Sequence, residues 1–478
     1  MIASTRIFTI ADQENFARLS GDWNPMHMDP IAARRTLAGA PVVHGVHAAL
    51  WALNELVQQD VVHASVASVA AQFARFVYLD RPVGLEVTAR DNAAVRAVIR
   101  SDGVQTSTLT VKLGSPEPLS GTAPELPVAR TEGAEPNVLS LQDMAGLAGW
   151  LRPQASVTEL QAMFPAACRC VGADRIGEIA LMSRLVGMIC PGLHSIFGAF
   201  AVNLAGYETK PGLGFQVTLA DQRFRRVQMK VAGSAIAGTV TTQARLPPVE
   251  QATMGHVRAS VDPREFAGQT ALVIGGSRGL GALTAKIIAA GGGKVLATYA
   301  VGREDAERLA SDITTHMGPD ACRVLPFNTS LPAASQLASV EGPVSHVYHF
   351  ASPRILRQSA ARFSPDLFQA FVRAYVMSFA EICEYLSSRD AAPLVAFYPS
   401  SVYVAGDRPS DMTEYAMAKA AGEVLCSELN RPPQEIRVIA QRLPRLLTDQ
   451  TAALTHIDVP DALETMLPLI REVQSVVA

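Results

Sequence analysis

An apolar run, a cluster of glycines and a second apolar run follow one another without interruption at residues 269–290. The first run is Gln269-Thr270-Ala271-Leu272-Val273-Ile274, the cluster is Gly275-Gly276-Ser277-Arg278-Gly279-Leu280-Gly281, and the second run extends from about Ala282 to Ala290. Strand, glycine turn and helix are the order that a dinucleotide site requires, because glycines let the backbone approach a pyrophosphate at the N-terminus of the helix. This segment predicts an α/β, Rossmann-type, doubly wound parallel sheet.

The strand that follows favours NADPH over NADH. It runs from Lys294 to Thr298 and lacks, at its end, the carboxylate that would bond the ribose 2′-hydroxyl. Arg278 can instead pair with a 2′-phosphate. Glu304 and Asp305 come soon after, but they lie at an expected helix start, where acidic residues stabilise the N-terminus in any case.

A serine, a tyrosine and a lysine form a second reactive set. An apolar strand from Leu394 ends at Ser401, and Tyr415 and Lys419 are four residues apart. On a helix that spacing places both side chains on one face. We expect the Lys419 ammonium to lower the pKa of the Tyr415 phenol and to reach a cofactor ribose, so that the phenol protonates a carbonyl whose oxygen Ser401 holds.

In this order, over roughly 210 residues, these motifs resemble the short-chain dehydrogenase/reductase family, specifically its 3-oxoacyl thioester reductases. Such enzymes usually associate through helices of this domain, which implies a homodimer or homotetramer. The resemblance implies these cofactor-binding residues: Gly275, Ser277, Arg278, Gly279, Leu280, Gly281, Thr298, Ala351, Ser352, Tyr415, Lys419 and Pro444.

Several positions depart from that family's pattern. The asparagine-alanine-glycine segment after the fourth strand is His349-Phe350-Ala351-Ser352, the helix asparagine of the proton relay is Tyr375, and the Pro-Gly after the sixth strand is Pro444-Arg445. Ser401 also lies one residue further from Tyr415 than in typical members. The serine, tyrosine and lysine remain in place, so the changes leave open whether the reductase is fully active or its proton relay runs through water.

Near the N-terminus, a turn-rich loop carries an acid, an amide and an imidazole. Its sequence is Ser20-Gly21-Asp22-Trp23-Asn24-Pro25-Met26-His27-Met28-Asp29-Pro30. Because these residue types break regular structure, we expect a tight loop that directs Asp22 and His27 toward a common point. A carboxylate and an imidazole that converge on one proton form a general acid/base pair. The structural alternative is that the acid and the amide only cap helices or close turns.

Gly45 lies where an apolar helix should begin, and backbone N–H groups at such a start can hold a developing oxyanion. The helix, from Val46 to Leu56, is almost free of charge and should be buried on most faces. Strand-like segments follow at Ala67 to Leu79, Leu85 to Arg90, Ala94 to Arg100 and Gln105 to Leu113. A buried helix followed by an antiparallel sheet that wraps it is the expected arrangement.

The segments S-G-D-x-N-P-x-H-x-D-P and P-x-x-H-G resemble the MaoC-like (R)-specific enoyl thioester hydratases of the hotdog fold. The resemblance implies that Asp22 and His27 divide proton removal at C2 from protonation of the leaving hydroxyl. It also implies that the N–H of Gly45 stabilises the enolate-like thioester oxygen, and that Asn24 fixes the loop or a water.

An internal repeat predicts a second hotdog half. Residues 191–200 parallel residues 44–53, and residues 217–229 parallel residues 66–79 in having a Gln followed by Phe and Arg. Pro191 replaces the histidine of the first half, and nothing before it resembles the acid–imidazole loop. We therefore expect a catalytically degenerate half. The alternative is a second site made of Ser183, Arg184 and His194.

These patterns predict a multidomain chain, an α+β double hotdog followed by an α/β Rossmann-type domain. At 478 residues, and with a prior of about 150 residues per domain, three domains are expected. The expected segments are a catalytic hotdog (1–114), a linker (115–136), a degenerate hotdog (137–246), a linker (247–265) and a reductase domain (266–478).

Composition excludes several other classes. The net charge of −3 offers no basic surface for nucleic acid. The six cysteines are scattered without ligand spacing, so we expect no metal and reduced thiols in a cytoplasmic protein. The first ten residues lack the apolar core of a signal peptide, and no apolar run reaches the roughly 18 residues of a membrane span.

Both resemblances imply consecutive reactions on one acyl thioester of coenzyme A or acyl carrier protein, in fatty acid or polyketide-type metabolism. NADPH would reduce a 3-oxoacyl thioester, and the hotdog half would dehydrate the 3-hydroxyacyl product to a trans-2-enoyl thioester; the sequence does not fix the direction. In one alternative only the dehydratase is active and the reductase-like domain is a scaffold. In another the chain is a non-catalytic acyl-carrier-binding module.

Overall fold

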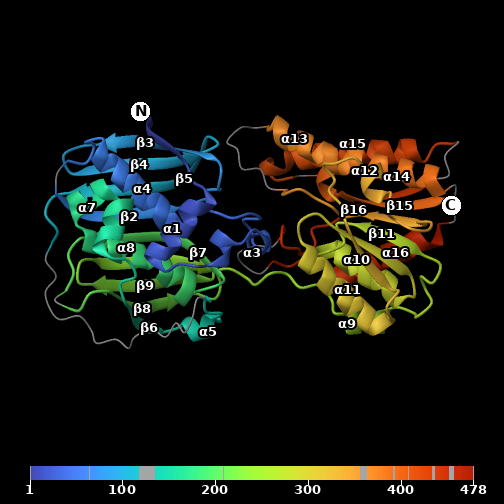
Figure 1. Cartoon of the computed structure of the whole chain (residues 1–478), viewed down its shortest axis with the longest axis horizontal. Coiled ribbons are helices and arrows are strands. Elements are labelled where there is room, and N and C mark those ends of the chain that lie inside the picture. Colours follow the sequence, from blue (N-terminus) through green and yellow to red (C-terminus); the bar gives the residue numbers. More distant parts are fainter. Residues whose placement is uncertain are drawn as a thin grey trace. The chain divides into compact units, whose positions relative to one another are not determined.

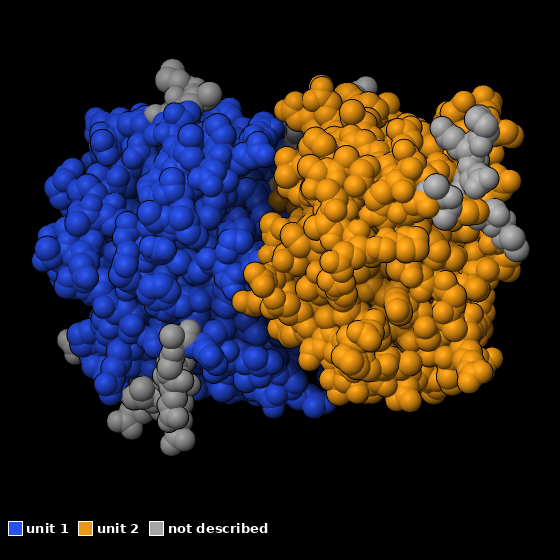
Figure 2. Space-filling model, turned by 45° about the vertical axis from the view of Figure 1, so that its right-hand side comes forward, with its two compact units in different colours: residues 1–247, 453–457 blue, residues 248–452, 458–478 orange. Residues whose placement is uncertain are grey.

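The chain folds into two compact units. Unit 1 comprises residues 1–247 and 453–457, and unit 2 comprises residues 248–452 and 458–478 (Figure 2). The computed structural model describes residues 2–63, 65–117, 135–207, 209–355, 363–390, 393–406, 408–432, 436–451 and 457–476.

Unit 1 is built on one ten-stranded antiparallel sheet whose two halves have matching strand orders (Figure 1). The order is β1-β3-β4-β5-β2 in the first half, continued by β7-β10-β9-β8-β6 in the second. The halves meet at β2 and β7, which pair from Ser68 opposite Asn203 to Gln72 opposite Ala199. The strands are β1 (Ile2–Ile7), β2 (Val66–Phe73), β3 (Pro82–Arg90), β4 (Ala94–Ser101), β5 (Val104–Leu113), β6 (Ala148–Leu151), β7 (Ser195–Asn203), β8 (Leu213–Ala220), β9 (Arg226–Gly233) and β10 (Ala237–Ala244).

One long helix per half packs on this sheet. Helix α4 (Gly45–Gln58) serves the first half, and α8 (Ala173–Arg184), continued by the π-helical turn η1 (Leu185–Ile189), serves the second. Both contribute buried residues to one apolar core with the sheet. Helix α4 is almost free of charge, whereas α8 carries charged residues and buries an apolar face. This confirms the predicted double hotdog. Shorter helices are α1 (Ile10–Ser20), α2 (Pro25–Met28), α3 (Pro30–Arg34), α5 (Leu141–Met144), α6 (Val157–Met163) and α7 (Pro165–Val171).

The alignment of the two halves predicted from the sequence is wrong. Residues 191–200 enter strand β7, whereas residues 44–53 form the start of helix α4. Residues 217–229 span β8 and β9, whereas β2 corresponds to β7 in strand order. Short apolar runs with a glycine suit either a helix or a buried strand, and the aromatic residues of β7 favour the strand.

Unit 2 is a six-stranded parallel sheet with helices on both faces (Figure 1). The strand order β13-β12-β11-β14-β15-β16 is that of the dinucleotide-binding fold. Separate apolar cores lie on the two faces, as a doubly wound sheet requires. This confirms the predicted Rossmann-type domain. Its strands are β11 (Thr270–Ile274), β12 (Lys294–Tyr299), β13 (Cys322–Pro326), β14 (His346–His349), β15 (Leu394–Ser401) and β16 (Ile436–Leu443).

The helices of unit 2 divide between the two cores. One core contains residues of α9 (Met254–Ser260), α10 (Gly279–Ala290), α11 (Arg303–Met317) and α16 (Ala462–Ser475). The other contains residues of α12 (Ala333–Leu337), α13 (Pro365–Val372), the π-helical turn η2 (Arg373–Met377), α14 (Ser378–Asp390) and α15 (Thr413–Leu429). Two 3-10 turns, η3 (Val402–Val404) and η4 (Ser410–Met412), precede α15. Within the described part of the chain, no helix combines the length and apolarity needed to cross a bilayer.

The predicted linkers have different outcomes. Residues 118–134 of the first linker lie outside the described residues. The second, residues 247–265, contains helix α9, so it is not a linker throughout. Met254 and Val257 are fully buried in the core of unit 2, and the Thr253 side chain caps the helix by accepting the His256 N–H. Prolines flank this helix without entering it, which explains why the sequence resembled a linker.

Candidate functional sites

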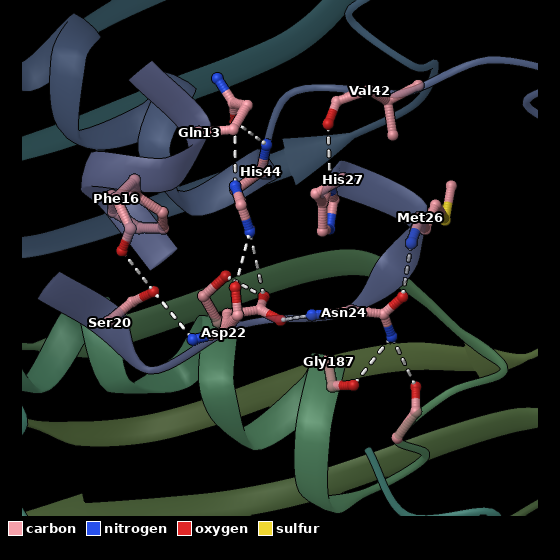
Figure 3. A network of polar contacts seen from close by, with 12 residues as sticks. Gln13, Phe16, Ser20, Asp22, Asn24, Met26, His27, Val42, His44 and Gly187 are labelled. Carbon is pink, nitrogen blue, oxygen red and sulfur yellow. Dashed lines mark hydrogen bonds and ion pairs between the residues drawn. The ribbon is translucent and has the colours of Figure 1, made fainter. Parts of the chain in front are cut away.

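Asp22 lies in the loop that follows α1, with only 2% of its surface exposed. Its carboxylate accepts a hydrogen bond from the Ser183 hydroxyl at 2.6 Å. It also accepts one from the Asn24 N–H at 3.2 Å (Figure 3). Burial raises the pKa of Asp22, and the neighbouring His27 and the Ser183 hydrogen bond oppose that effect only in part. The environment therefore favours the protonated acid more than water does.

His27 is held with one ring nitrogen directed at the backbone. Its Nδ1 lies 2.7 Å from the carbonyl oxygen of Val42 (Figure 3). Because a carbonyl oxygen only accepts hydrogen bonds, Nδ1 carries the hydrogen, and Nε2 of the neutral ring bears the lone pair. This tautomer makes Nε2 the basic atom.

Asn24 acts as a clamp between the two halves of unit 1. Its side-chain oxygen accepts the Met26 N–H at 3.0 Å, which caps α2. Its amide nitrogen donates to the carbonyl oxygens of Gly187, at 2.8 Å, and Gly192, at 3.2 Å. These bonds use both N–H groups of the amide, so the structure gives Asn24 a positioning role.

His44 stacks against His27, with ring centroids 3.8 Å apart. Its Nδ1 lies 2.9 Å from Gln13 Oε1, and its Nε2 lies 3.1 Å from the carbonyl oxygen of Asp22. Burial, followed by the neighbouring His27, lowers the pKa of His44 well below its ordinary value. His44 was not among the site residues predicted from sequence.

Ligand atoms of Asp22, His27 and His44 lie within 4.8 Å of one another, a spacing that a metal ion could use. His44, however, already directs both ring nitrogens at protein oxygens, Nδ1 at Gln13 Oε1 and Nε2 at the carbonyl oxygen of Asp22. This leaves only Asp22 and His27 to hold an ion, so the donor set fits a hydrogen-bonded acid/base cluster better than a metal centre.

A cleft with about 640 Å³ of empty space, part of it open to solvent, lies against this cluster. Gly45 begins α4 here; His44 precedes it without making a side-chain cap, and a Cβ on Gly45 would lie 3.2 Å from the Phe73 ring. The first N–H groups of α4 can thus face a ligand. The lining is Asp22, Asn24, Met26, His27, Val42, Val43, Gly45, Ala48, Phe73, Arg75, Phe76, Val77, Ser107, Ser183, Val186, Gly187, Ser195, Ile196 and Phe197.

The second half of unit 1 completes this site, which the sequence did not reveal. Ser183 bonds Asp22, and Gly187 lies so close that a Cβ there would be 2.6 Å from the Asp22 Cγ. Conversely, Asn54 of α4 accepts the N–H groups of Ala166 and Ala167 at the start of α7. Each half therefore supports a segment of the other. The alternative second site around Ser183 is not formed, because its hydroxyl belongs to the first.

In unit 2 the residues of the glycine turn pack tightly against neighbouring backbone. Gly275 has φ +73°, and a Cβ there would lie 2.6 Å from the Ala351 nitrogen. A Cβ on Gly281 would overlap the Gly275 carbonyl oxygen. The Gly275 N–H donates to Thr298 Oγ1 at 3.0 Å, so Thr298 supports the turn. Only glycine fits these positions, as close approach to a pyrophosphate requires.

Arg278, the predicted partner of a 2′-phosphate, already has carboxylate neighbours. It precedes α10, forms an ion pair with Asp449, and lies 3.7 Å from an oxygen of Asp305. Asp305 therefore does more than stabilise the start of α11. Among the other predicted cofactor residues, Pro444 directly follows β16, and Ala351 and Ser352 lie two and three residues after the end of β14.

Ser401, Tyr415 and Lys419 come together as predicted, but their electrostatics differ from the prediction. Burial raises the pKa of Tyr415 to about 12, and the hydrogen bond with Ser401 opposes that shift. The Lys419 ammonium lies 5.9 Å from the Tyr415 ring centroid and donates to the Pro399 carbonyl oxygen at 2.6 Å. The pKa of Tyr415 is thus shifted upward, opposite to the predicted lowering, because burial is the largest cause of the shift.

Tyr375 occupies the space beside this lysine. Its ring centroid lies 4.0 Å from the Lys419 nitrogen, and its hydroxyl lies 2.5 Å from Ser352 Oγ. Burial lowers the pKa of Lys419 to about 7. The aromatic surroundings explain the shift, because they remove water without supplying a carboxylate.

This lysine should make the stability of unit 2 depend on pH. The folded pKa of about 7 is below the ordinary 10.5, so between these values the unfolded chain binds the extra proton. The unfolding free energy should then rise with pH from about 7 toward 10.5. Below pH 7 Lys419 is charged in both the folded and the unfolded state, so the folded state bears the full cost of burying that charge. Urea unfolding at pH 7 and 9.5 should show a smaller rise for Lys419→Met than for the unmodified protein; equal changes would contradict the assignment.

Residues 3–111 match the family model described as MaoC like domain. A stretch of 46 residues is 39% identical to the mitochondrial 3-hydroxyacyl-[acyl-carrier-protein] dehydratase of Arabidopsis thaliana, covering 10% of this chain and 28% of that protein. The chain thus aligns with less than a third of this curated relative. The family match confirms the MaoC-like resemblance predicted for the first half.

Solved structures similar to the chain include short-chain dehydrogenases. One from Burkholderia cenocepacia J2315, in complex with NADP, is 21% identical, covers 44% of this chain and 94% of its own, and has a TM-score of 0.37. A putative one from Pseudomonas syringae is 18% identical, with coverages of 47% and 93% and a TM-score of 0.38. The fold of unit 2 is established by its own strand order.

Proposed function

We propose, from the MaoC-like match over residues 3–111 and the dinucleotide strand order of unit 2, that the protein is a bifunctional enzyme. Unit 1 would dehydrate (R)-3-hydroxyacyl thioesters, and unit 2 would be an NADPH-dependent 3-oxoacyl thioester reductase of the short-chain dehydrogenase/reductase type. The observation that carries the proposal is the convergence of Asp22, His27 and Gly45 on one cleft.

In the proposed dehydration, His27 Nε2 removes a proton from C2 of the substrate. Asp22, protonated more readily because it is buried, gives a proton to the hydroxyl that leaves C3 as water. The backbone N–H groups from Gly45 onward face the thioester oxygen, where negative charge develops as the C2 proton departs. Ser183 and Asn24 hold the acid and the loop in position.

In the proposed reduction, Tyr415 donates the proton to the C3 oxygen. Its raised pKa keeps the phenol protonated over the physiological range. Ser401, hydrogen-bonded to that phenol, orients the carbonyl. Lys419, 5.9 Å from the Tyr415 ring centroid and with a pKa of about 7, supplies in its protonated form positive charge beside the phenol. The glycine turn and Arg278 would hold NADPH, which would supply the hydride for C3.

A second candidate retains only the dehydratase, with unit 2 as a scaffold. Two observations favour it. The Tyr375 ring fills space against Lys419, and Asp449 neutralises Arg278. Both contacts involve residues that a working reductase would use.

A single incubation separates these candidates. The full-length protein is mixed with NADPH and a short 3-oxoacyl thioester, and NADPH absorbance is followed together with product mass. We expect NADPH to be consumed and the product to gain two hydrogens and then lose water. Dehydration of an added 3-hydroxyacyl thioester with NADPH untouched would establish the scaffold alternative, and binding without either turnover would indicate a non-catalytic module.

A further inference from the structure

A short segment after β16 folds over the start of α10. Residues 446–451 are tied together by Thr451, whose hydroxyl donates to the Leu446 carbonyl oxygen at 2.5 Å and accepts the Thr448 N–H at 2.8 Å. A Cβ on Gly279 would lie 3.5 Å from the Thr448 side chain. The segment therefore lies beside the helix start that would receive the cofactor phosphates.

Other parts of unit 2 hold this segment in place. The Gln251 side chain donates to the Leu447 carbonyl oxygen at 3.0 Å, and the Ile355 N–H donates to the Gln450 side chain at 3.1 Å. The Val249 N–H donates to Asp449 at 3.2 Å. Asp449 is thereby fixed with its carboxylate directed at Arg278.

The ion pair between Asp449 and Arg278 is largely shielded from water. The two side chains are 12% and 20% exposed, and Asp305, 7% exposed, lies 3.7 Å from Nη1 of the same guanidinium. Asp305 also pairs with Arg308, so the two carboxylates and two guanidinium groups of this cluster balance in charge. A 2′-phosphate would add about two negative charges at pH 7. The guanidinium can receive that phosphate only if a carboxylate yields its place.

We propose that Asp449 acts as an internal anion at Arg278 and sets the selectivity between phosphorylated and unphosphorylated dinucleotides. The inference rests on the proposed dinucleotide binding by unit 2. NADPH must displace Asp449, so its apparent affinity is reduced by the fraction of molecules in which the ion pair is closed. NADH has no 2′-phosphate and does not compete for this guanidinium, so its affinity does not depend on Asp449.

The test compares dissociation constants of NADPH and NADH for the full-length protein and for Asp449→Asn, which keeps the shape and still accepts the Val249 N–H. We expect Asp449→Asn to bind NADPH about tenfold more tightly, a change of about 1.4 kcal/mol, and NADH within about twofold of the unmodified protein. Asp449→Ser removes the charge independently and should act in the same direction. The fragment 2′,5′-ADP, which carries the 2′-phosphate, should show the same gain.

The matched control is Glu265→Gln, which removes a carboxylate that pairs with Arg471 elsewhere in unit 2. It should leave both dissociation constants unchanged. In the double variant Arg278→Ala with Asp449→Asn, the gain for NADPH should vanish. Unchanged NADPH affinity in both Asp449 variants, or an equal gain for NADH, would overturn the proposal while leaving the reductase assignment intact. Failure of every form to bind either dinucleotide would overturn both.

Discussion

Replacing Gly187 with alanine should lower the dehydration rate by about a hundredfold, because misplacing a reacting group by about 1 Å costs that much. A Cβ on Gly187 would lie 2.6 Å from the Asp22 Cγ and 2.7 Å from its Oδ2, well inside contact distance. Gly187 lies in the buried turn η1, so the carboxylate must move instead. Loss of water from an (R)-3-hydroxyacyl thioester, followed by the absorbance of the enoyl product, measures the effect.

Gly84→Ala is the matched control, since nothing lies within 4 Å of a Cβ at that position in the same unit. It should retain full dehydratase activity. Ser183→Ala removes a hydrogen bond to Asp22 without adding bulk, and its loss should be smaller, about tenfold. NADPH-dependent reduction should remain normal in all three variants. A Gly187→Ala protein with unchanged dehydration would show that Asp22 does not act in catalysis from its present position.

The features predicted correctly from sequence are those fixed by neighbouring residues. The glycine turn at 275–281 and the four-residue spacing from Tyr415 to Lys419 are local, and local geometry follows from residue type. The apolar helix α4 and the doubly wound sheet follow in the same way. The alignment of the second half failed because a short apolar run does not distinguish β7 from a buried helix.

The missing parts of the sites come from distant segments of the chain. Asp22 and Ser183 are 161 residues apart, and they meet because the two halves that carry them pair through β2 and β7 and pack around one core. Asp449, which follows the last strand of the parallel sheet, pairs with Arg278, which follows the first strand. The pKa of Tyr415 depends on how much water packing removes, which spacing alone does not reveal. The sequence alone therefore does not predict these contacts between distant residues.

Replacing Tyr415 with phenylalanine should lower the reduction of a 3-oxoacyl thioester by at least about a hundredfold, the smallest contribution expected of a positioned proton donor. The substitution removes the phenol that Ser401 contacts but preserves the ring, which packs edge-on against Tyr375 at 5.7 Å. Folding and NADPH binding should therefore survive. The loss should appear in kcat with little change in the dissociation constant of NADPH, measured by fluorescence.

Tyr385→Phe is the matched control, because it removes a phenol from α14 outside the Ser401, Tyr415 and Lys419 group. It should reduce the substrate at the normal rate, and both variants should dehydrate 3-hydroxyacyl thioesters normally, because Asp22 and His27 lie in unit 1. If Tyr415→Phe kept its reductase activity, another group would protonate the C3 oxygen. Tyr375 would then be the next phenol to test, since its ring lies closer to the Lys419 nitrogen than that of Tyr415 does, 4.0 Å against 5.9 Å. The hydroxyl of Tyr375 contacts the exposed Ser352, so a proton taken from it could be replaced from solvent.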